Sequence, residues 1–365
     1  MVYLDHGATS FPKLKAVQRA MLEAMASCAN PGRSGHRPAM AAAETVYRCR
    51  ERAAQMFHCQ SEQVVFTSNC THGLNMAIRT LVQPGDSVLI SGFEHNAVTR
   101  PLHALGADIR VAGRRLFAWE DTLEQFEKAL KKGVKAAVFT HASNVFGYIL
   151  PVEEMGDLCR QYRIPFIVDA AQSAGILEID LQKLGADFVA MPGHKGLLGP
   201  MGTGLLLCGR EPIPLICGGT GSMSEEQTMP DFLPDRAEAG TLNVPGIAGL
   251  SAGLDYVAQV GTATILKRQQ LQVQRCAAGL KEMGISVFSG PHQSGTLSFV
   301  PGMDCQDAAE KLWKRGIAVR AGLHCAPLAH ESGGTLPGGT VRISFGHDAC
   351  DRQSACFLAE MEKMS

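Results

Sequence analysis

Between residues 64 and 207, short apolar runs alternate with helix-forming stretches, and this alternation is the feature that most constrains the fold. The runs are rich in Val, Ile, Leu and Phe and are too short for typical helices. They lie at 64–67, 87–90, 136–139, 166–168, 188–190 and 204–207. Such runs are typical of strands buried on both faces of a parallel sheet. Their alternation with helices predicts an α/β domain with helices on both faces of a mostly parallel sheet.

The pattern changes near residue 250, which predicts a second domain. Helices are expected at 13–28 and 38–57 in the large domain, which we place at residues 15–245. Further helices are expected at 246–283, 305–315 and 348–363, and short strands at 285–289, 295–300, 317–320 and 340–344. This mixture predicts a small α+β domain at 246–365.

The composition excludes several classes of function. The chain has 34 basic and 35 acidic residues, so we expect neither a nucleic-acid-binding nor a membrane-binding surface. Its first residues lack the features of a signal peptide, and no apolar run approaches the length of a membrane span. The twelve cysteines are scattered without a C-x-x-C pair, which favours reduced thiols over disulfides or structural zinc. The sequence therefore predicts a soluble, cytoplasmic protein without a metal site.

Two neighbouring strand ends carry polar groups that suit one cofactor. The strand ending near Val168 delivers Asp169, and the strand ending near Pro192 delivers Lys195. The carboxyl ends of such strands open onto a crevice. Pyridoxal phosphate (PLP) requires a lysine amine that holds it covalently and an acid that keeps its ring nitrogen protonated. Taken singly, the two residues also fit a helix cap and a surface turn.

The motifs around these residues resemble those of the aminotransferase class V family. They are Val168-Asp169-Ala170-Ala171-Gln172, Gly193-His194-Lys195-Gly196 and Gly199-Pro200-Met201-Gly202-Thr203-Gly204. Within that family, residues 320–326 resemble the catalytic cysteine loop of group II cysteine desulfurases and selenocysteine lyases. The resemblance runs from Tyr3 to Ser344. It implies a fold-type I PLP-dependent transferase whose large domain holds a mostly parallel seven-stranded sheet, with residues 1–14 packed on the small domain.

The resemblance assigns the residues that surround the cofactor ring. Lys195 holds the cofactor covalently, and Asp169 lies against the ring nitrogen with a pKa that we expect to be depressed by the neighbouring cation. Gln172 reaches the ring oxygen. His95 stacks on the ring and moves protons, although its alternative role is a helix cap or a solvated loop residue. Asn144 lies beside the ring oxygen and the substrate carboxylate, although it also fits a turn.

The resemblance also assigns the phosphate site. Thr71 and the backbone of Cys70, at the expected start of a helix, bind the phosphate, since helix N-termini favour anions; a plain helix cap is the alternative. His194 is a second phosphate ligand. Thr241 reaches the phosphate of the neighbouring subunit, which predicts a homodimer with a shared site. One departure is Pro192, where the family has Ser or Thr, because proline offers neither a hydroxyl nor an N–H group.

The small domain is expected to supply the substrate site. Arg342 matches the residue that binds the substrate α-carboxylate, and its planar guanidinium suits that group; an exposed edge-strand arginine is the alternative. Arg320 lines the site entrance. Ala8 matches a stretch at the start of the chain that approaches the substrate.

Cys325 is predicted to be the nucleophile. It alone among the cysteines lies in a Gly- and His-containing loop between two expected strands. A reactive cysteine must be a thiolate, which nearby cations favour, and we expect His324, Arg320 and Arg342 to provide that positive field. The family often has a second histidine where this chain has Leu323. The alternative, an inert buried thiol, is the expectation for the other eleven cysteines.

These residues together predict a PLP-dependent cysteine desulfurase that converts L-cysteine to L-alanine and leaves a persulfide on Cys325. We expect a sulfur-acceptor protein to take the sulfur from this persulfide. A selenocysteine lyase acting on L-selenocysteine would use the same parts. A class V aminotransferase would not need Cys325. A non-catalytic scaffold of the same fold is the alternative outside enzymes, and Pro192 supports it. A nicotinamide enzyme is disfavoured because no G-x-G-x-x-G follows a first strand.

Overall fold

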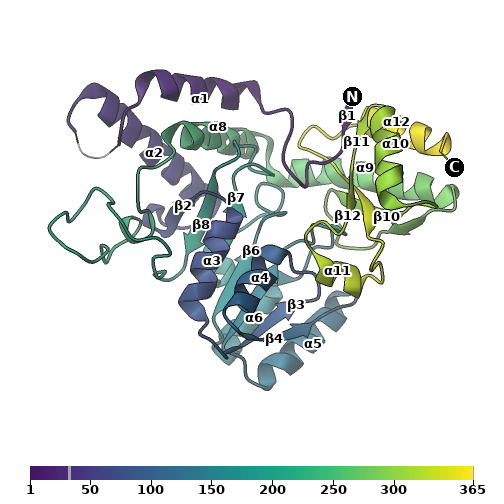
Figure 1. Ribbon diagram of the computed structural model, residues 1–365, viewed down its shortest axis with the longest axis horizontal. Coiled ribbons are helices and arrows are strands. Elements are labelled where there is room, and N and C mark those ends of the chain that lie inside the picture. Colours follow the sequence, from purple (N-terminus) through teal and green to yellow (C-terminus); the bar gives the residue numbers. More distant parts are fainter. Residues whose placement is uncertain (32–33, 365) are drawn as a thin grey trace.

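The computed structural model describes residues 1–31 and 34–364. A seven-stranded sheet is the centre of its larger part (Figure 1). Its strand order is β2-β8-β7-β6-β5-β3-β4. The strands are β2 (Val64–Thr67), β3 (Ser87–Ser91), β4 (Asp108–Ala112), β5 (Ala136–Thr140), β6 (Phe166–Asp169), β7 (Phe188–Pro192) and β8 (Gly204–Cys208). Only β8 pairs antiparallel, with β2 and β7, and the other pairs are parallel. The predicted mostly parallel sheet is confirmed.

Six of the seven strands match the apolar runs in the sequence, and β4 was not expected. Its sequence, Asp-Ile-Arg-Val-Ala, mixes charged and apolar residues. It lies at the edge of the sheet, where it pairs only with β3 among the described strands. An edge strand is partly solvated and does not need a continuous apolar run, so the pattern that marks buried strands does not mark this one.

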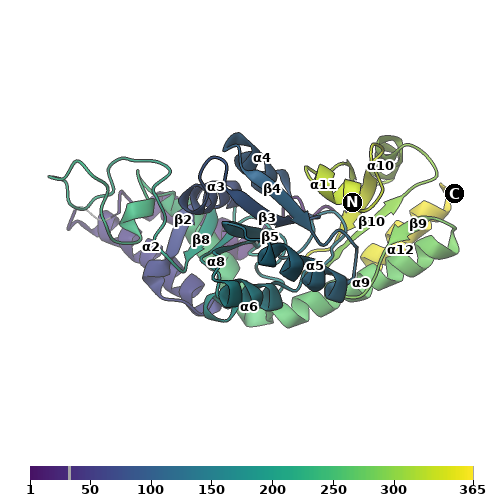
Figure 2. The ribbon, with the colours of Figure 1, turned by 90° about the horizontal axis from the view of Figure 1, so that it is seen from below.

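Helices cover both faces of this sheet, as predicted. They are α1 (Lys15–Ser27), α2 (Arg37–Met56), α3 (Cys70–Leu81), α4 (Asn96–Ala104), α5 (Trp119–Lys131), α6 (Val152–Tyr162), α7 (Leu181–Leu184) and α8 (Val244–Val260), with short 3-10 turns at Ser61–Gln63 and Asp235–Ala237. Side chains of α2, α5, α6 and α8 form one core with alternate strand residues. Side chains of α3 and α4 form a second core with the intervening residues. In Figure 2, α6 and α8 lie on the side of the sheet away from α3 and α4.

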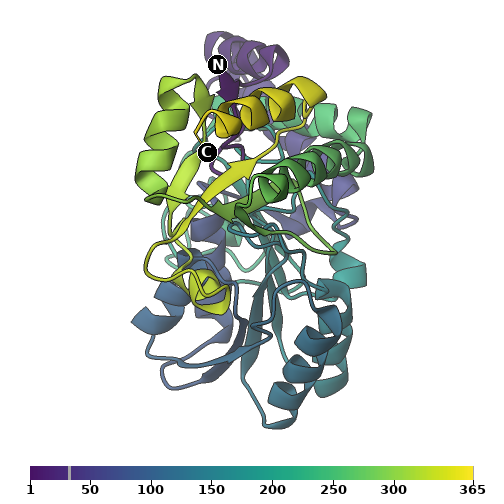
Figure 3. The ribbon, with the colours of Figure 1, turned by 90° about the vertical axis from the view of Figure 1, so that its right-hand side faces the viewer.

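A smaller antiparallel sheet follows, with the order β12-β13-β10-β9. Its strands are β9 (Ser286–Phe288), β10 (Thr296–Val300), β12 (Arg320–Gly322) and β13 (Thr340–Ser344). The helices that accompany it are α9 (Thr262–Glu282), α10 (Cys305–Lys314), α11 (Pro327–Ser332) and α12 (Asp351–Glu362). In Figure 3, α9 and α12 lie side by side on this sheet. The apolar core here is separate from the cores of the large sheet.

The first residues of the chain pack with this second sheet. Strand β1 (Val2–Tyr3) pairs parallel with β11 (Ile317–Ala318), and Asp5 bridges to Ser344 at the end of β13. Both termini lie at this end of the molecule (Figure 1). The domain boundaries at residues 15 and 245 stay a prediction, and the large core includes Leu250 of α8.

A buried ion pair ties the segment before α8 to the large sheet. Both Glu238 carboxylate oxygens accept hydrogen bonds from the Arg50 guanidinium at 2.8 Å. One of these oxygens also accepts from the Phe66 backbone N–H at 2.6 Å. Both charged residues are about 8% exposed, so the loss of either one would leave the other as a buried charge without a partner. The pair therefore fixes the chain three residues before Thr241 against β2.

We predict that Glu238→Ala lowers the free energy of unfolding by about 3–5 kcal/mol, because the Arg50 charge would stay buried without a partner. Denaturant-induced unfolding followed by circular dichroism measures this change. Glu44→Ala is the matched control, since it breaks an exposed pair with Arg48 on α2 and is expected to cost about 0.5 kcal/mol or less. Equal losses in the two variants would contradict the importance of the buried pair.

Candidate active site

The carboxyl ends of β6 and β7 bring together the two residues predicted to hold the cofactor. Asp169 is the last residue of β6, and Lys195 follows three residues after β7. Because the two strands are parallel neighbours, their ends meet at the same edge of the sheet. The Asp169 Oδ1 atom accepts hydrogen bonds from the Ala171 N–H at 2.9 Å and from the Cys70 thiol at 3.4 Å. Cys70 at the start of α3 therefore contacts the carboxylate through its side chain, which the sequence did not suggest.

The pKa of Asp169 is shifted in the opposite direction from the one predicted. Burial lowers the pKa of Lys195, and the Asp169 charge opposes this shift. Burial likewise raises the pKa of Asp169, and this effect exceeds the lowering by the Ala171 N–H and by Lys195. The expected depressed pKa of Asp169 is therefore wrong for the protein alone, because the cost of removing the carboxylate from water is the larger effect.

His95 follows the end of β3 by four residues and caps α4. Its Nδ1 atom accepts a hydrogen bond from the Ala97 N–H at 3.0 Å. Burial, followed by the positive charges of Lys195 and Arg320, lowers the pKa of His95 to about 4. The imidazole is therefore neutral at pH 7, and because Nδ1 accepts the Ala97 N–H, the ring carries its proton on Nε2. The helix-cap role and a role in the site are compatible in this geometry.

Glu94, next to His95, is a buried acid that sequence reasoning missed. It is fully buried, and its Oε1 atom accepts hydrogen bonds from the Ser91 hydroxyl at 2.5 Å and the Thr140 N–H at 2.9 Å. Burial raises its pKa to about 8. Glu94 therefore joins the ends of β3 and β5 beneath the site. A glutamate followed by histidine after an apolar strand is the sequence signal that could have identified it.

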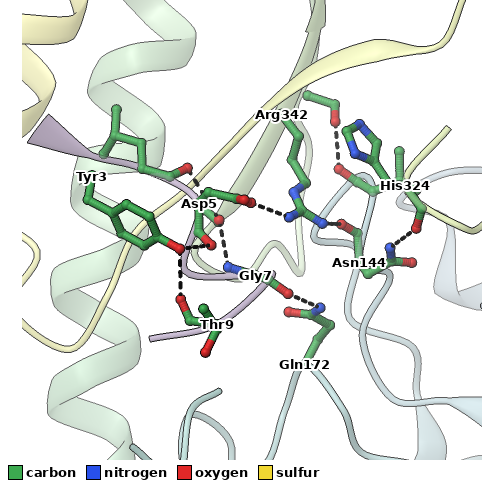
Figure 4. Close-up of polar contacts among 12 residues, drawn as sticks. Tyr3, Asp5, Gly7, Thr9, Asn144, Gln172, His324 and Arg342 are labelled. Atoms are coloured by element: carbon green, nitrogen blue, oxygen red, sulfur yellow. Dashed lines mark hydrogen bonds and ion pairs between the residues drawn. The ribbon is translucent and has the colours of Figure 1, made fainter. Parts of the chain in front are cut away.

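Arg342 and Asn144 link the second sheet to the first (Figure 4). Arg342, in β13, is 1% exposed and donates from Nη1 to the Asn144 carbonyl at 2.8 Å. Its Nη2 atom donates to Asp5 Oδ1 at 2.6 Å. The Asn144 amide donates to the His324 carbonyl at 2.8 Å. The alternative of an exposed edge-strand arginine is excluded, since β13 lies between β12 and β10. Asp5 was not predicted as a site residue. The pattern that could have identified it is a charged residue directly after the short apolar run at residues 2–4.

The segment at residues 5–10 lies between the two sheets. It forms hydrogen bonds with two of the residues that were predicted to bind the cofactor. Gln172 donates from its side chain to the Gly7 carbonyl at 2.9 Å. The ring of His194 contacts the Thr9 hydroxyl at 3.1 Å. A hollow of about 30 Å³ lined by Gly7, Gln172 and Lys195 separates this segment from the lysine. The predicted roles of Gln172, His194 and neighbouring Ala8 toward ligands stay predictions.

A larger cavity of about 530 Å³ opens at the start of α3. Thr71 and Thr241 line it together, and the Ser68 residue adds a further hydroxyl. The helix N-terminus with these hydroxyls suits an anion such as phosphate. Thr241, which the resemblance assigned to a neighbouring subunit, lies in the same chain's cavity as Thr71 here. Ser68 offers a replacement for the hydroxyl that Pro192 lacks.

Cys325 lies on a loop that is held in place from three directions. The Asn96 N–H donates to the Cys325 carbonyl at 2.8 Å, and Asn144 binds the preceding carbonyl as described. The His324 ring contacts the Thr340 hydroxyl at 3.3 Å. Both His324 and Cys325 have positive φ angles, 49° and 56°, a conformation that costs energy for residues other than glycine. The loop holds this strained turn and leaves the Cys325 side chain exposed.

His324 does not supply the positive field predicted for Cys325. It is buried, and burial together with the Arg342 charge lowers its pKa to about 2. The ring is therefore neutral, and this part of the prediction is wrong. The cations near the site are Arg320, Arg342 and Lys195, whose charges all act on His95.

The other cysteines differ from Cys325 in their surroundings. All twelve are free thiols. Burial raises the pKa of Cys49, Cys159 and Cys276 to about 12, so these thiols stay protonated and inert. Cys217 and Cys350 are exposed as well.

The residues at the crevice fit a PLP-type cofactor and an amino-acid substrate. Among the described residues, Asn144 Oδ1 and Arg342 Nε are buried polar atoms without a hydrogen-bond partner. Buried polar groups normally have partners, so a ligand with both donors and acceptors would complete this site. The Asp169 carboxylate suits a protonated ring nitrogen, the Lys195 amine an aldehyde, and the hydroxyls of the α3 cavity a phosphate.

The chain matches the family model "aminotransferase class-V" over residues 2–353. It is 35% identical to a probable cysteine desulfurase of Methanothermobacter thermautotrophicus, over 92% of this chain and 88% of that protein. It is 33% identical to a probable cysteine desulfurase of Pyrococcus abyssi, over 100% of this chain and 94% of the relative.

Its structure is similar to the apo structure of a cysteine desulfurase from Thermococcus onnurineus NA1, with a TM-score of 0.91, 33% identity and coverage of 100% and 94% of the two chains. The chain therefore belongs to the aminotransferase class V family. The predicted family and fold-type I architecture are confirmed. Within residues 1–31 and 34–364, no helix is long and apolar enough to cross a membrane.

We predict that the protein loses stability in acid because of its buried neutral histidines. The pKa values of His95 and His141 fall from 6.5 to about 4 in the folded chain. Between these pH values the unfolded chain binds more protons, so the free energy of unfolding falls as the pH falls. The expected slope is about 1.4 kcal/mol per pH unit for each such histidine. Denaturant unfolding across this pH range measures the slope.

His141→Gln should reduce the slope by one histidine's share, and the exposed His103→Gln should leave it unchanged. A slope that is the same in His141→Gln and in the unmodified chain would contradict the buried neutral state of His141.

Proposed function

We propose that this chain is a PLP-dependent cysteine desulfurase that releases L-alanine and retains the sulfur on Cys325. The observation that carries the proposal is the position of Cys325. Its side chain is exposed on a loop whose backbone is bound by Asn96, the residue after His95, and by Asn144. The relatives named cysteine desulfurases support the same activity.

PLP, when bound, supplies an aldehyde that joins to amines and a protonated ring that accepts electrons. The residues of this chain provide its surroundings. Lys195 anchors it, Asp169 keeps its ring nitrogen protonated, and Gln172 and Asn144 bind its ring oxygen. Thr71, the Cys70 backbone and His194 bind its phosphate, together with Thr241 of a neighbouring subunit.

The protein then positions the substrate and moves its protons. Arg342 binds the α-carboxylate, with Arg320 and Ala8 beside it. Lys195 takes the α-proton and is a suitable base because burial lowers its pKa. His95, neutral at pH 7, moves protons nearby through its Nε2–H group.

The Cys325 thiolate attacks the substrate sulfur. A sulfur–sulfur bond forms, the carbon–sulfur bond breaks, and its electron pair stays with the substrate carbon, which a proton converts to the methyl group of alanine. The products are L-alanine and a persulfide on Cys325. We propose that an acceptor protein collects this sulfur by attacking the exposed side chain.

We also propose that the protein is a cytoplasmic homodimer. Apolar side chains are exposed along the segment before α8, namely Ile213, Ile216, Met223 and Phe232, and exposed apolar patches are typical of interfaces. Thr241 follows this segment and is also exposed. Twelve free thiols support a reducing compartment.

We predict that Lys195→Ala abolishes covalent attachment of PLP, because the variant has no amine at this site. Absorbance spectra of the purified protein, followed by mass spectrometry after borohydride reduction, measure the attachment. Lys183→Ala, at an exposed lysine on α7, should keep the modification. A reduced adduct of equal amount in the Lys195 variant would contradict the assignment.

We predict that Cys325→Ala keeps the PLP absorbance and loses alanine formation from L-cysteine on the order of a hundredfold or more, because the attacking thiolate is removed. An assay for alanine and sulfide measures the loss, and Cys350→Ser serves as the control at another exposed cysteine. Parallel assays with L-selenocysteine test the alternative substrate. Unchanged desulfuration by Cys325→Ala would refute the nucleophile.

A further inference from the structure

Arg342 is a buried cation whose orientation depends on groups around it. At 1% exposure its guanidinium cannot rely on water, and burial lowers its pKa whereas the Asp5 charge raises it. Asp5 is therefore the counter-ion of this arginine. Its contact, Nη2 to Oδ1 at 2.6 Å, is a charge-assisted hydrogen bond, which is among the stronger and more directional contacts in proteins.

We propose that Asp5 is the positioning residue of the substrate carboxylate site: it holds Arg342 so that the Nε–H group is left to bind the carboxylate of the amino acid. This inference rests on the proposed function. Asp5 does not touch the substrate in this account. It acts through Arg342, and it lies in the first residues of the chain, which pack with the second sheet.

Asp5 is itself held rigidly (Figure 4). The chain at Asp5 bridges to Ser344 of β13, and the next residue donates its N–H to the Ser344 carbonyl at 3.4 Å. The Tyr3 hydroxyl lies 3.1 Å from the carbonyl oxygens of both Asp5 and Thr9. Because Ser344 and Arg342 are two residues apart on one strand, their side chains lie on the same face. The backbone pairing therefore sets the carboxylate against the guanidinium.

The other atoms of the guanidinium are also constrained. Nη1 donates to the Asn144 carbonyl at 2.8 Å. Gly7 packs against the guanidinium so closely that a Cβ atom there would lie 3.2 Å from Cζ and 3.3 Å from Nη2. Among the described residues, Nε has no partner although it is buried. The two η nitrogens thus fix the plane of the group, and the one remaining unpartnered nitrogen is the donor that a substrate carboxylate would complete.

Asp5 has two opposing effects on a substrate carboxylate, and orientation is the larger one. Its negative charge repels the incoming carboxylate, but the same charge neutralises a buried cation that would otherwise move toward other acceptors. The hydrogen bond that Nε donates depends steeply on angle. A guanidinium released from Asp5 would lose that angle, so removal of Asp5 should weaken carboxylate binding.

The test compares Asp5→Ala and Asp5→Asn with the unmodified PLP-bound protein. The probes are L-alanine and L-alaninamide, which share the amine and the methyl group and differ in the carboxylate. Dissociation constants are measured from the change in PLP absorbance. For Asp5→Ala we expect the constant for L-alanine to rise about tenfold, with L-alaninamide within twofold of the unmodified protein. The KM for L-cysteine should rise in parallel, with kcat changing less.

Asp5→Asn keeps the size of the side chain and a hydrogen-bond acceptor, so it should fold if Asp5→Ala does not, and we expect an intermediate rise for L-alanine alone. Asp108→Ala, which removes an exposed partner of Arg110 on the edge strand β4, should change neither constant. Unchanged or tighter L-alanine binding by the Asp5 variants, or equal weakening of both probes, would overturn the proposal. If the unmodified protein binds L-alanine but forms no alanine from L-cysteine, the proposed function fails and the Asp5 result still stands.

Discussion

The site depends on a carboxylate and an amine that the ends of two parallel strands bring to one edge of the large sheet. Removing such groups from water costs several kcal/mol each, and the opposite pKa shifts of Asp169 and Lys195 reflect this cost. The sheet provides the geometry, since β6 and β7 are parallel neighbours whose ends open onto one crevice. Titratable groups whose pKa values are shifted by burial and by a neighbouring charge are typical of catalytic sites. A protonated ring nitrogen beside Asp169 would give the carboxylate the charge partner that offsets its burial.

Three parts of the chain meet at the proposed substrate site. The large sheet contributes Asn144, the second sheet contributes Arg342, and the first residues of the chain contribute Asp5. The cysteine loop is bound to the same asparagine through the His324 carbonyl. Asn144 therefore connects Arg342, the proposed carboxylate-binding residue, to the loop that carries Cys325, the proposed nucleophile.

Features that depend on a local residue pattern, such as buried strands and motifs, could be predicted from the sequence. The pKa values of buried groups could not. Apolar runs identified the buried strands, whereas the edge strand β4 carries too many charged residues to be recognised. Motif resemblance assigned roles to Lys195, Asp169 and Cys325, and these assignments stay predictions. It could not reveal that burial raises the pKa of Asp169 or neutralises His324, because desolvation depends on the whole surrounding structure. The partnership of Asp5 with Arg342 joins residues 337 positions apart, and no local pattern encodes it.

The most direct test of this account is a crystal structure of the protein purified with PLP. The account predicts continuous density from Lys195 Nζ to the cofactor, a ring nitrogen within hydrogen-bond distance of the Asp169 carboxylate, and a phosphate at the start of α3. A cofactor bound elsewhere, or a ring nitrogen turned away from Asp169, would contradict it.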